Sequence, residues 1–231
     1  MITRNRIYGK REPSKDAHKI YVICEGKSDE PRYFGFFEGL SSNLNVITIP
    51  SEEGKTDPKK LSELATSLFD VETSRFSLDY TQGDRVWFVV DTDEWEKDGK
   101  IAQLRSFCQN KNDEIFQLQT ELKAYSVWNI AQSNPSFEIW LYYHFYADAP
   151  INEEVEKAAS FKHFVDGKIN GGFNYNTDPV RLKDAIINAD GNFAVTKQGL
   201  LALYSTELAS LGREINGFVL TELSKLYNKL R

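Results

Sequence analysis

Three acidic residues stand directly after short apolar segments of the kind that form buried strands. Glu25 follows residues 19–24, and Asp91 and Asp93 follow residues 85–90. Side chains at positions i and i+2 of an extended segment point to the same side, so Asp91 and Asp93 are expected to project together. Ligands of open α/β sheets bind beyond the carboxyl ends of the strands. If the two strands are neighbours, Glu25 joins the aspartate pair.

Three carboxylates in one crevice repel one another, and without a cation at least one of them would have a raised pKa. A hard divalent ion removes that cost, because Mg²⁺ prefers carboxylate oxygens and keeps several waters that a phosphate can displace. Such an ion stabilises charge on phosphoryl oxygens and activates water. We therefore expect Mg²⁺ or Mn²⁺ at Asp91, Asp93 and Glu25, with Glu25 also acting as general acid or base. A solvated turn is the alternative for the short D-x-D.

Strand and helix patterns alternate along the chain and would position these acids. Strands are predicted at residues 19–24, 44–50, 85–90 and 124–128, and helices at residues 29–40, 59–71, 100–110 and 135–146. This order predicts an α/β fold with a mostly parallel sheet flanked by helices. Further helices are predicted at residues 152–165, 178–189 and 215–230. We divide the chain into a flexible leader (1–18), an α/β domain (19–150) and a helical C-terminal extension packed on the core (151–231).

Composition limits the classes of function. Hydrophobic residues make up 41% of the 231 residues, which is ordinary for a globular protein, and no long apolar run predicts a membrane span. The net charge of −6 disfavours general affinity for nucleic acid, so such a substrate requires a local basic patch or a partner that delivers it. Cys24 and Cys108 form no C-x-x-C pair, which argues against structural zinc and favours the reducing cytoplasm.

Three sequence blocks together resemble the RloB family. They are V-I-C-E-G-K-S-D-E-P-R-Y-F at residues 22–34, V-V-D-T-D at residues 89–93, and S-N-P-S-F-E-I-W-L at residues 133–141 with H-F at residues 144–145. The resemblance extends over roughly residues 19–190. It implies a Toprim-like fold, in which the strand-end glutamate and the D-x-D hold Mg²⁺ for phosphoryl transfer.

The resemblance also implies an activity. Members are prokaryotic, are often encoded beside an ATPase and are linked with antiphage defence. We therefore expect an endonuclease or ribonuclease that cleaves RNA, tRNA or DNA, works with an ATPase partner, and acts in antiviral defence through abortive infection. Glu138 matches the acid of the third block and is expected to be a further metal ligand. An acid in that apolar helix is costly unless it is paired, so an ion pair within the fold is the alternative.

Two lysines are candidates for contact with a substrate phosphate. Lys27 lies beside Glu25, and Lys168 lies next to a glycine-rich and asparagine-rich loop. A solvated loop lysine is the alternative for Lys27. His144 is interpreted as a packed, hydrogen-bonded histidine.

Two other functions and the oligomeric state stay open. One alternative is a regulatory module that binds a nucleotide or a metal-phosphate signal, and the other is another phosphotransfer enzyme that polymerises nucleotides. A homodimer is one alternative for the assembly.

Overall fold

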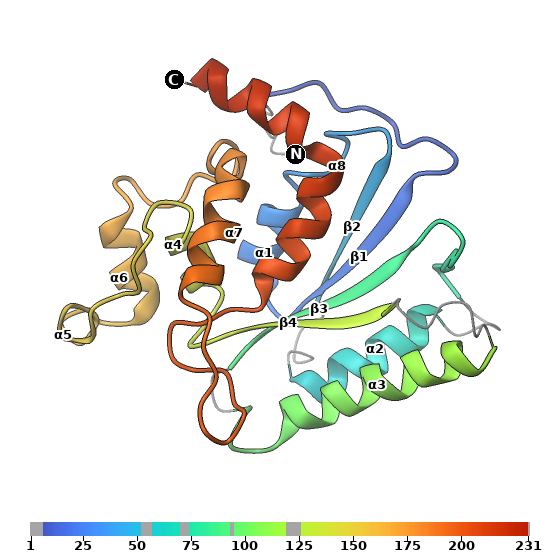
Figure 1. Cartoon of the computed structure of the whole chain (residues 1–231), viewed down its shortest axis with the longest axis horizontal. Helices are drawn as coiled ribbons and strands as arrows, with labels where there is room; N and C mark the ends of the chain where they lie inside the picture. Colours follow the sequence, from blue (N-terminus) through green and yellow to red (C-terminus); the bar gives the residue numbers. More distant parts are fainter. Residues whose placement is uncertain (1–6, 52–56, 70–73, 93–94, 119–125, 231) are drawn as a thin grey trace.

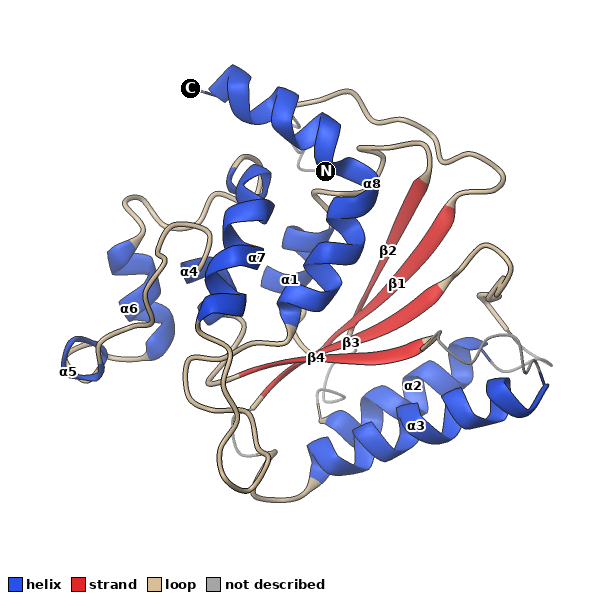
Figure 2. Ribbon diagram, in the orientation of Figure 1, coloured by secondary structure: helices blue, strands red, loops and turns tan. Residues whose placement is uncertain are grey.

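The computed structural model describes residues 7–51, 57–69, 74–92, 95–118 and 126–230. Within these residues, four parallel strands form one sheet in the order β2-β1-β3-β4 (Figures 1 and 2). The strands are β1 (His18–Cys24), β2 (Leu44–Pro50), β3 (Arg85–Asp91) and β4 (Trp128–Ser133). The predicted α/β class with a parallel sheet is confirmed. Because β1 and β3 are neighbours, their carboxyl ends lie side by side.

Helices cover both faces of the sheet. One face carries α2 (Pro58–Phe69) and α3 (Lys100–Leu118), while α1 (Asp29–Phe34), α4 (Glu138–Tyr142), α7 (Leu182–Gly191) and α8 (Leu208–Leu230) cover the other (Figure 1). Successive strand residues alternate between the two cores, so Val22 faces α1 and Ile23 faces α2. Burial on both faces explains why β1 and β3 are nearly continuous apolar runs.

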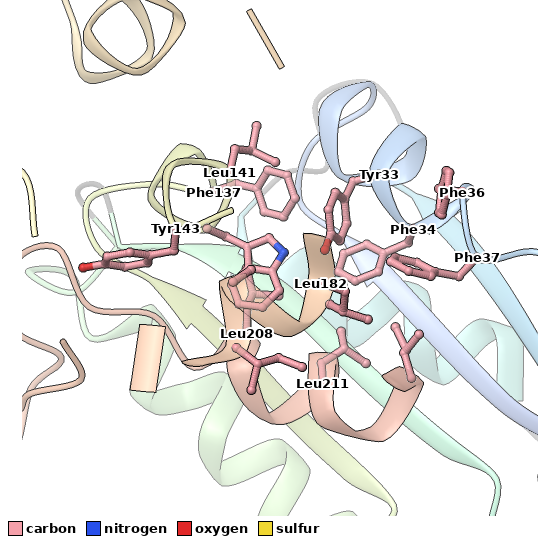
Figure 3. Close-up of a cluster of buried hydrophobic side chains, with 14 of the residues drawn as sticks. Tyr33, Phe34, Phe36, Phe37, Phe137, Leu141, Tyr143, Leu182, Leu208 and Leu211 are labelled. Atoms are coloured by element: carbon pink, nitrogen blue, oxygen red, sulfur yellow. The ribbon is translucent and has the colours of Figure 1, made fainter. Parts of the chain in front are cut away.

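The larger core is rich in aromatic side chains. Figure 3 shows Tyr33 and Phe34 of α1 packing toward Phe137, Leu182 and Leu211. Burial of one such side chain contributes about 1.5–3 kcal/mol. Helices α7 and α8 therefore share one core with the sheet and with α1. The proposed division at residue 150 stays a prediction.

The shorter elements complete the chain. Helix α5 (Asn152–Val155), helix α6 (Phe161–Lys168) and the 3₁₀ helix η2 (Asp178–Arg181) follow α4. Residues 7–17 run along the turns after α1, where Arg11 N donates to Gly39 O and Ser14 N donates to Ser42 O. In the described part of the chain, no helix combines the length and the apolar character that crossing a membrane requires.

Several predicted boundaries were wrong. The last strand does not span residues 124–128: β4 begins at Trp128 and runs to Ser133, and residues 124–125 lie outside the described part. The polar residues Gln132 and Ser133 near the end of β4 do not look like a buried strand in the sequence, because the groups that hydrogen bond to them come from distant segments. Helix α1 ends at Phe34 and continues as turns, α4 covers only part of residues 135–146, and residues 152–165 hold two helices. Helices α3 and α8 are longer than predicted.

Candidate functional site

Glu25 and Asp91 come together at the carboxyl ends of β1 and β3. The amide of Glu25 continues the strand pairing by donating to Val89 O over 3.0 Å. Its carboxylate then reaches across to β3, where Asp91 N donates to Glu25 Oε2 over 2.9 Å. The indole Nε1 of Trp95 donates to Glu25 Oε1 over 2.7 Å. The structure thus places two of the three predicted acids side by side, and Asp93 lies outside the described residues.

The donor set of this pair suits a hard divalent ion. Both residues are partly exposed, although Oδ1 of Asp91 is buried. Each oxygen of the Glu25 carboxylate accepts one N–H hydrogen bond, which fixes its orientation, and carboxylate oxygens are the ligands that hard divalent ions prefer. Glu25 and Asp91 therefore fit Mg²⁺ or Mn²⁺ by chemistry. Across the described ranges, no group of three His, Cys, Asp or Glu side chains is close enough to hold a metal, and Asp93 as the third ligand stays a prediction.

A second acidic group adjoins the first through the loop after β1. The buried Glu30 of α1 accepts a hydrogen bond from Gly26 N at its Oε1, over 3.1 Å. Burial raises the pKa of the Glu30 carboxyl, and the negative charges of Asp29 and Glu138 add to the rise, against two backbone hydrogen bonds that lower it. A Cβ at position 26 would lie 2.0 Å from Glu30 Oε2. Glycine at position 26 therefore lets Glu30 close the loop that follows Glu25.

Glu138 has both a hydrogen bond and an ion pair. Ser136 Oγ donates to Glu138 Oε2 over 2.6 Å, and Lys162 Nζ lies 3.7 Å from Glu138 Oε1. Lys162 also hydrogen bonds to Asp29, and that bond raises the pKa of the lysine. An ion pair within the fold, the alternative that the sequence offered for Glu138, is therefore present. Its role as a metal ligand stays a prediction.

Sequence reasoning missed the residues around this second group. Lys162 lies in helix α6, outside every motif, and no local signal distinguishes it from a surface lysine. The Arg32 guanidinium stacks over the Tyr175 ring with 4.3 Å to the centroid. Burial raises the pKa of the Tyr175 hydroxyl, and the charge of Asp29 adds to this effect. Three segments far apart in sequence therefore meet at Asp29.

The two predicted substrate lysines lie in different surroundings. Lys27 is exposed in the loop directly after Glu25 and Gly26. Lys168 Nζ lies 2.7 Å from Glu154 Oε2, so this lysine ties α6 to α5. In the described part of helix α6, the lysine that contacts Asp29 and Glu138 is Lys162 and not Lys168. A phosphate-binding role for Lys27 or Lys168 stays a prediction.

His144 is a structural connection between α1 and the turn after α4. Its ring is buried, with Nε2 3.0 Å from the Tyr33 hydroxyl and Nδ1 2.9 Å from Trp140 O. Burial lowers the pKa of His144 to about 3, so the ring is neutral at pH 7. A neutral ring then donates from Nδ1 to the carbonyl and accepts at Nε2 from Tyr33. The interpretation as a packed, hydrogen-bonded histidine is confirmed.

Comparison with known proteins places this arrangement in a family. The family model described as RloB-like protein matches residues 20–201, most of the 231-residue chain. Neither the curated proteins nor the solved structures contain a match. The matched span includes Glu25, Asp91, Asp93 and Glu138. The chain therefore belongs to the RloB-like protein family.

Proposed function

We propose that this protein is a metal-dependent nuclease of the Toprim type that hydrolyses phosphodiester bonds of RNA, tRNA or DNA. The supporting observation is the meeting of Glu25 and Asp91 at the ends of adjacent parallel strands, joined by the 2.9 Å hydrogen bond from Asp91 N to Glu25 Oε2. That edge of an open α/β sheet is where ligands bind. Carboxylates held there supply the hard oxygen ligands of Mg²⁺ or Mn²⁺.

Each residue of the site has a distinct proposed task. Glu25, Asp91 and Asp93 hold the metal ion, and Glu138 is its outer ligand. When bound, the ion supplies positive charge to the phosphoryl oxygens and lowers the pKa of a bound water. Trp95 and the Asp91 amide fix the orientation of the Glu25 carboxylate. A carboxylate oriented in this way can take a proton from water, which is the general-base task.

The substrate assignment must be reconciled with a net charge of −6. Basic side chains gather locally beside the acids: Lys27 after β1, Arg32 on α1 and Lys162 on α6. Lys162 has a side chain that is 54% exposed, so it can contact a phosphate while it remains near Asp29 and Glu138. We propose that this patch receives the nucleic-acid backbone. Cytoplasmic antiphage defence with an ATPase partner is part of the proposal and rests on the family resemblance.

The direct test is cleavage by isosteric variants. Purified protein is incubated with RNA, tRNA and DNA in Mg²⁺ or Mn²⁺, and products are resolved on a gel. Glu25→Gln and Asp91→Asn are each expected to lower the cleavage rate on the order of a hundredfold or more, as loss of an acid–base group or metal ligand does. Glu114→Gln on the exposed face of α3 is the matched control and is expected to keep the wild-type rate.

Two results would contradict the nuclease assignment. One is wild-type cleavage rates in both active-site variants. The other is nucleotide binding by isothermal titration together with no cleavage of any substrate, which would favour the regulatory module.

A further inference from the structure

A cavity of about 330 Å³ lies beside the carboxyl end of β4. Its walls come from the first turns of α3, from β4 and from residues 195–201, whose ends are joined by an antiparallel bridge between Val195 and Leu201. Figure 1 shows that this segment lies next to the end of β4 and the start of α3. The volume is at the lower end of the roughly 300–1,000 Å³ of small-molecule sites. It therefore suits a single ring system.

A connected polar network forms one wall. Gln132 is 1% exposed, and its Nε2 donates to Thr92 Oγ1 over 2.9 Å and to Glu96 Oε2 over 2.8 Å. Its Oε1 accepts from Arg105 Nη2 over 2.7 Å, and the same nitrogen donates to Glu207 Oε2 over 2.9 Å. The network holds one guanidinium and two carboxylates in fixed positions. It leaves a net negative charge, which disfavours a phosphate inside the cavity.

The same network touches the candidate metal site. Thr92 directly follows Asp91, and Glu96 directly follows Trp95, whose indole binds Glu25. The cavity wall is therefore linked to both acids, through Gln132 bound to the residue after Asp91 and through Glu96 beside the tryptophan that binds Glu25. Leu200 and Leu201 also line the cavity and offer apolar side chains.

We propose that the cavity binds a guanine base of the nucleic acid, next to the phosphodiester bond that is cleaved; this inference rests on the proposed nuclease function. Within the described residues, Oε1 of Glu96 and Oε1 of Glu207 have no hydrogen-bond donor. Guanine presents the N1–H and N2–H donors that such oxygens accept, together with O6 and N7 acceptors for an arginine. Adenine, cytosine and uracil each match only part of this pattern.

The geometry also orients the rest of the nucleotide. The base packs against Leu200 and Leu201, while the acidic network keeps the phosphate outside the cavity. The phosphate is then directed toward Asp91 at the end of β3, where the metal ion is proposed to bind. Base recognition in the cavity would thus place one phosphodiester bond at the acids.

The test measures nucleotide binding separately from cleavage. Wild-type protein is titrated by calorimetry with guanosine 5′-monophosphate in EDTA, and adenosine, cytidine and uridine 5′-monophosphates are titrated in parallel. Guanosine 5′-monophosphate is expected to bind at least about tenfold more tightly than the others, which corresponds to about 1.4 kcal/mol. Ala102→Trp, which fills the cavity from an exposed position on α3, is expected to abolish this binding.

Further variants keep the result interpretable. The double variant Glu96→Gln with Glu207→Gln retains an acceptor for Gln132 and Arg105 but can turn an amide toward the base, so a loss of at least about tenfold is expected. Glu114→Gln is the control with unchanged affinity, and thermal unfolding checks that Ala102→Trp is folded.

These measurements distinguish an incorrect guanine site from an incorrect nuclease function. Equal affinity for all four nucleotides, or unchanged affinity in folded Ala102→Trp, would overturn the guanine site whatever the cleavage assay shows. Selective binding of guanosine 5′-monophosphate by a protein that cleaves nothing would support the site and would contradict the nuclease.

Discussion

Glu25 was predictable at the residue scale because its position depends on strand order alone. Once the apolar segments at residues 19–24 and 85–90 are taken as neighbouring parallel strands, the acids that follow them must share an edge. The bond from Asp91 N to Glu25 Oε2 bears this out. Lys162 and Trp95 could not be found in this way, because nothing local marks a lysine of α6 or an indole in a loop as a partner of distant acids.

His144 supplies a prediction of pH dependence. Its pKa is about 3 in the folded protein against about 6.5 in the unfolded chain. Between these values the unfolded state binds a proton that the folded state does not, so stability rises with pH in this window. The contribution of neutral His144 to the free energy of unfolding is complete above about pH 6.5 and is lost as the pH falls toward 3. Acidification from pH 7.5 to 5 is expected to lower the free energy of unfolding by about 2 kcal/mol through His144 alone.

The measurement is urea unfolding of the wild type and of His144→Gln across this pH range. In the variant, the free energy of unfolding is expected to depend less steeply on pH, by about the amount that the uptake of one proton on unfolding contributes. Glu30 contributes with the opposite sign, because its raised pKa makes the folded state bind more protons above the usual carboxyl range. Since Glu30 is present in both proteins, its effect cancels in the difference. Identical slopes would show that His144 is not a buried neutral ring.

At the scale of elements, periodicity predicted which segments form strands and helices better than where they end. Strand β2 has the predicted bounds, while β4 was misplaced because Gln132 and Ser133 look like loop residues. Their polar groups are satisfied by Thr92, Glu96 and Thr206, which lie far away in the sequence. Polar residues inside a strand become acceptable only through such tertiary partners.

Two glycines of α8 give a matched prediction of helix packing. A Cβ at Gly212 would lie 3.1 Å from both Ile186 Cγ1 and Trp140 Cη2, whereas a Cβ at Gly217 meets nothing within 4 Å. Gly217→Ala is therefore expected to stabilise by about 0.5–1 kcal/mol, the usual cost of glycine in a helix. Gly212→Val is expected to destabilise by about 1–3 kcal/mol through overpacking. Urea unfolding measures both, and a Gly212→Val protein as stable as the wild type would refute the close approach of α8 to α4 and α7.

For the whole molecule, the sequence predicted the class of fold and the family, while the way in which the C-terminal half packs needed the structure. The aromatic core joins Phe34 of α1 to Leu208 and Leu211 of α8, and this contact could not be read from local periodicity (Figure 3). The order β2-β1-β3-β4 brings the acids to one edge. The Toprim-like identity of the fold, the domain boundaries and the assembly stay predictions.

The central claim is that Glu25 and Asp91 share one divalent cation. Crystals soaked in Mn²⁺ and measured for anomalous scattering test it most directly. An anomalous peak is expected within coordinating distance of Glu25 and Asp91 carboxylate oxygens, and this peak is expected to be absent from Glu25→Gln crystals soaked in the same way. A strong Mn²⁺ peak elsewhere in the molecule with none between these two acids would contradict a shared cation at Glu25 and Asp91.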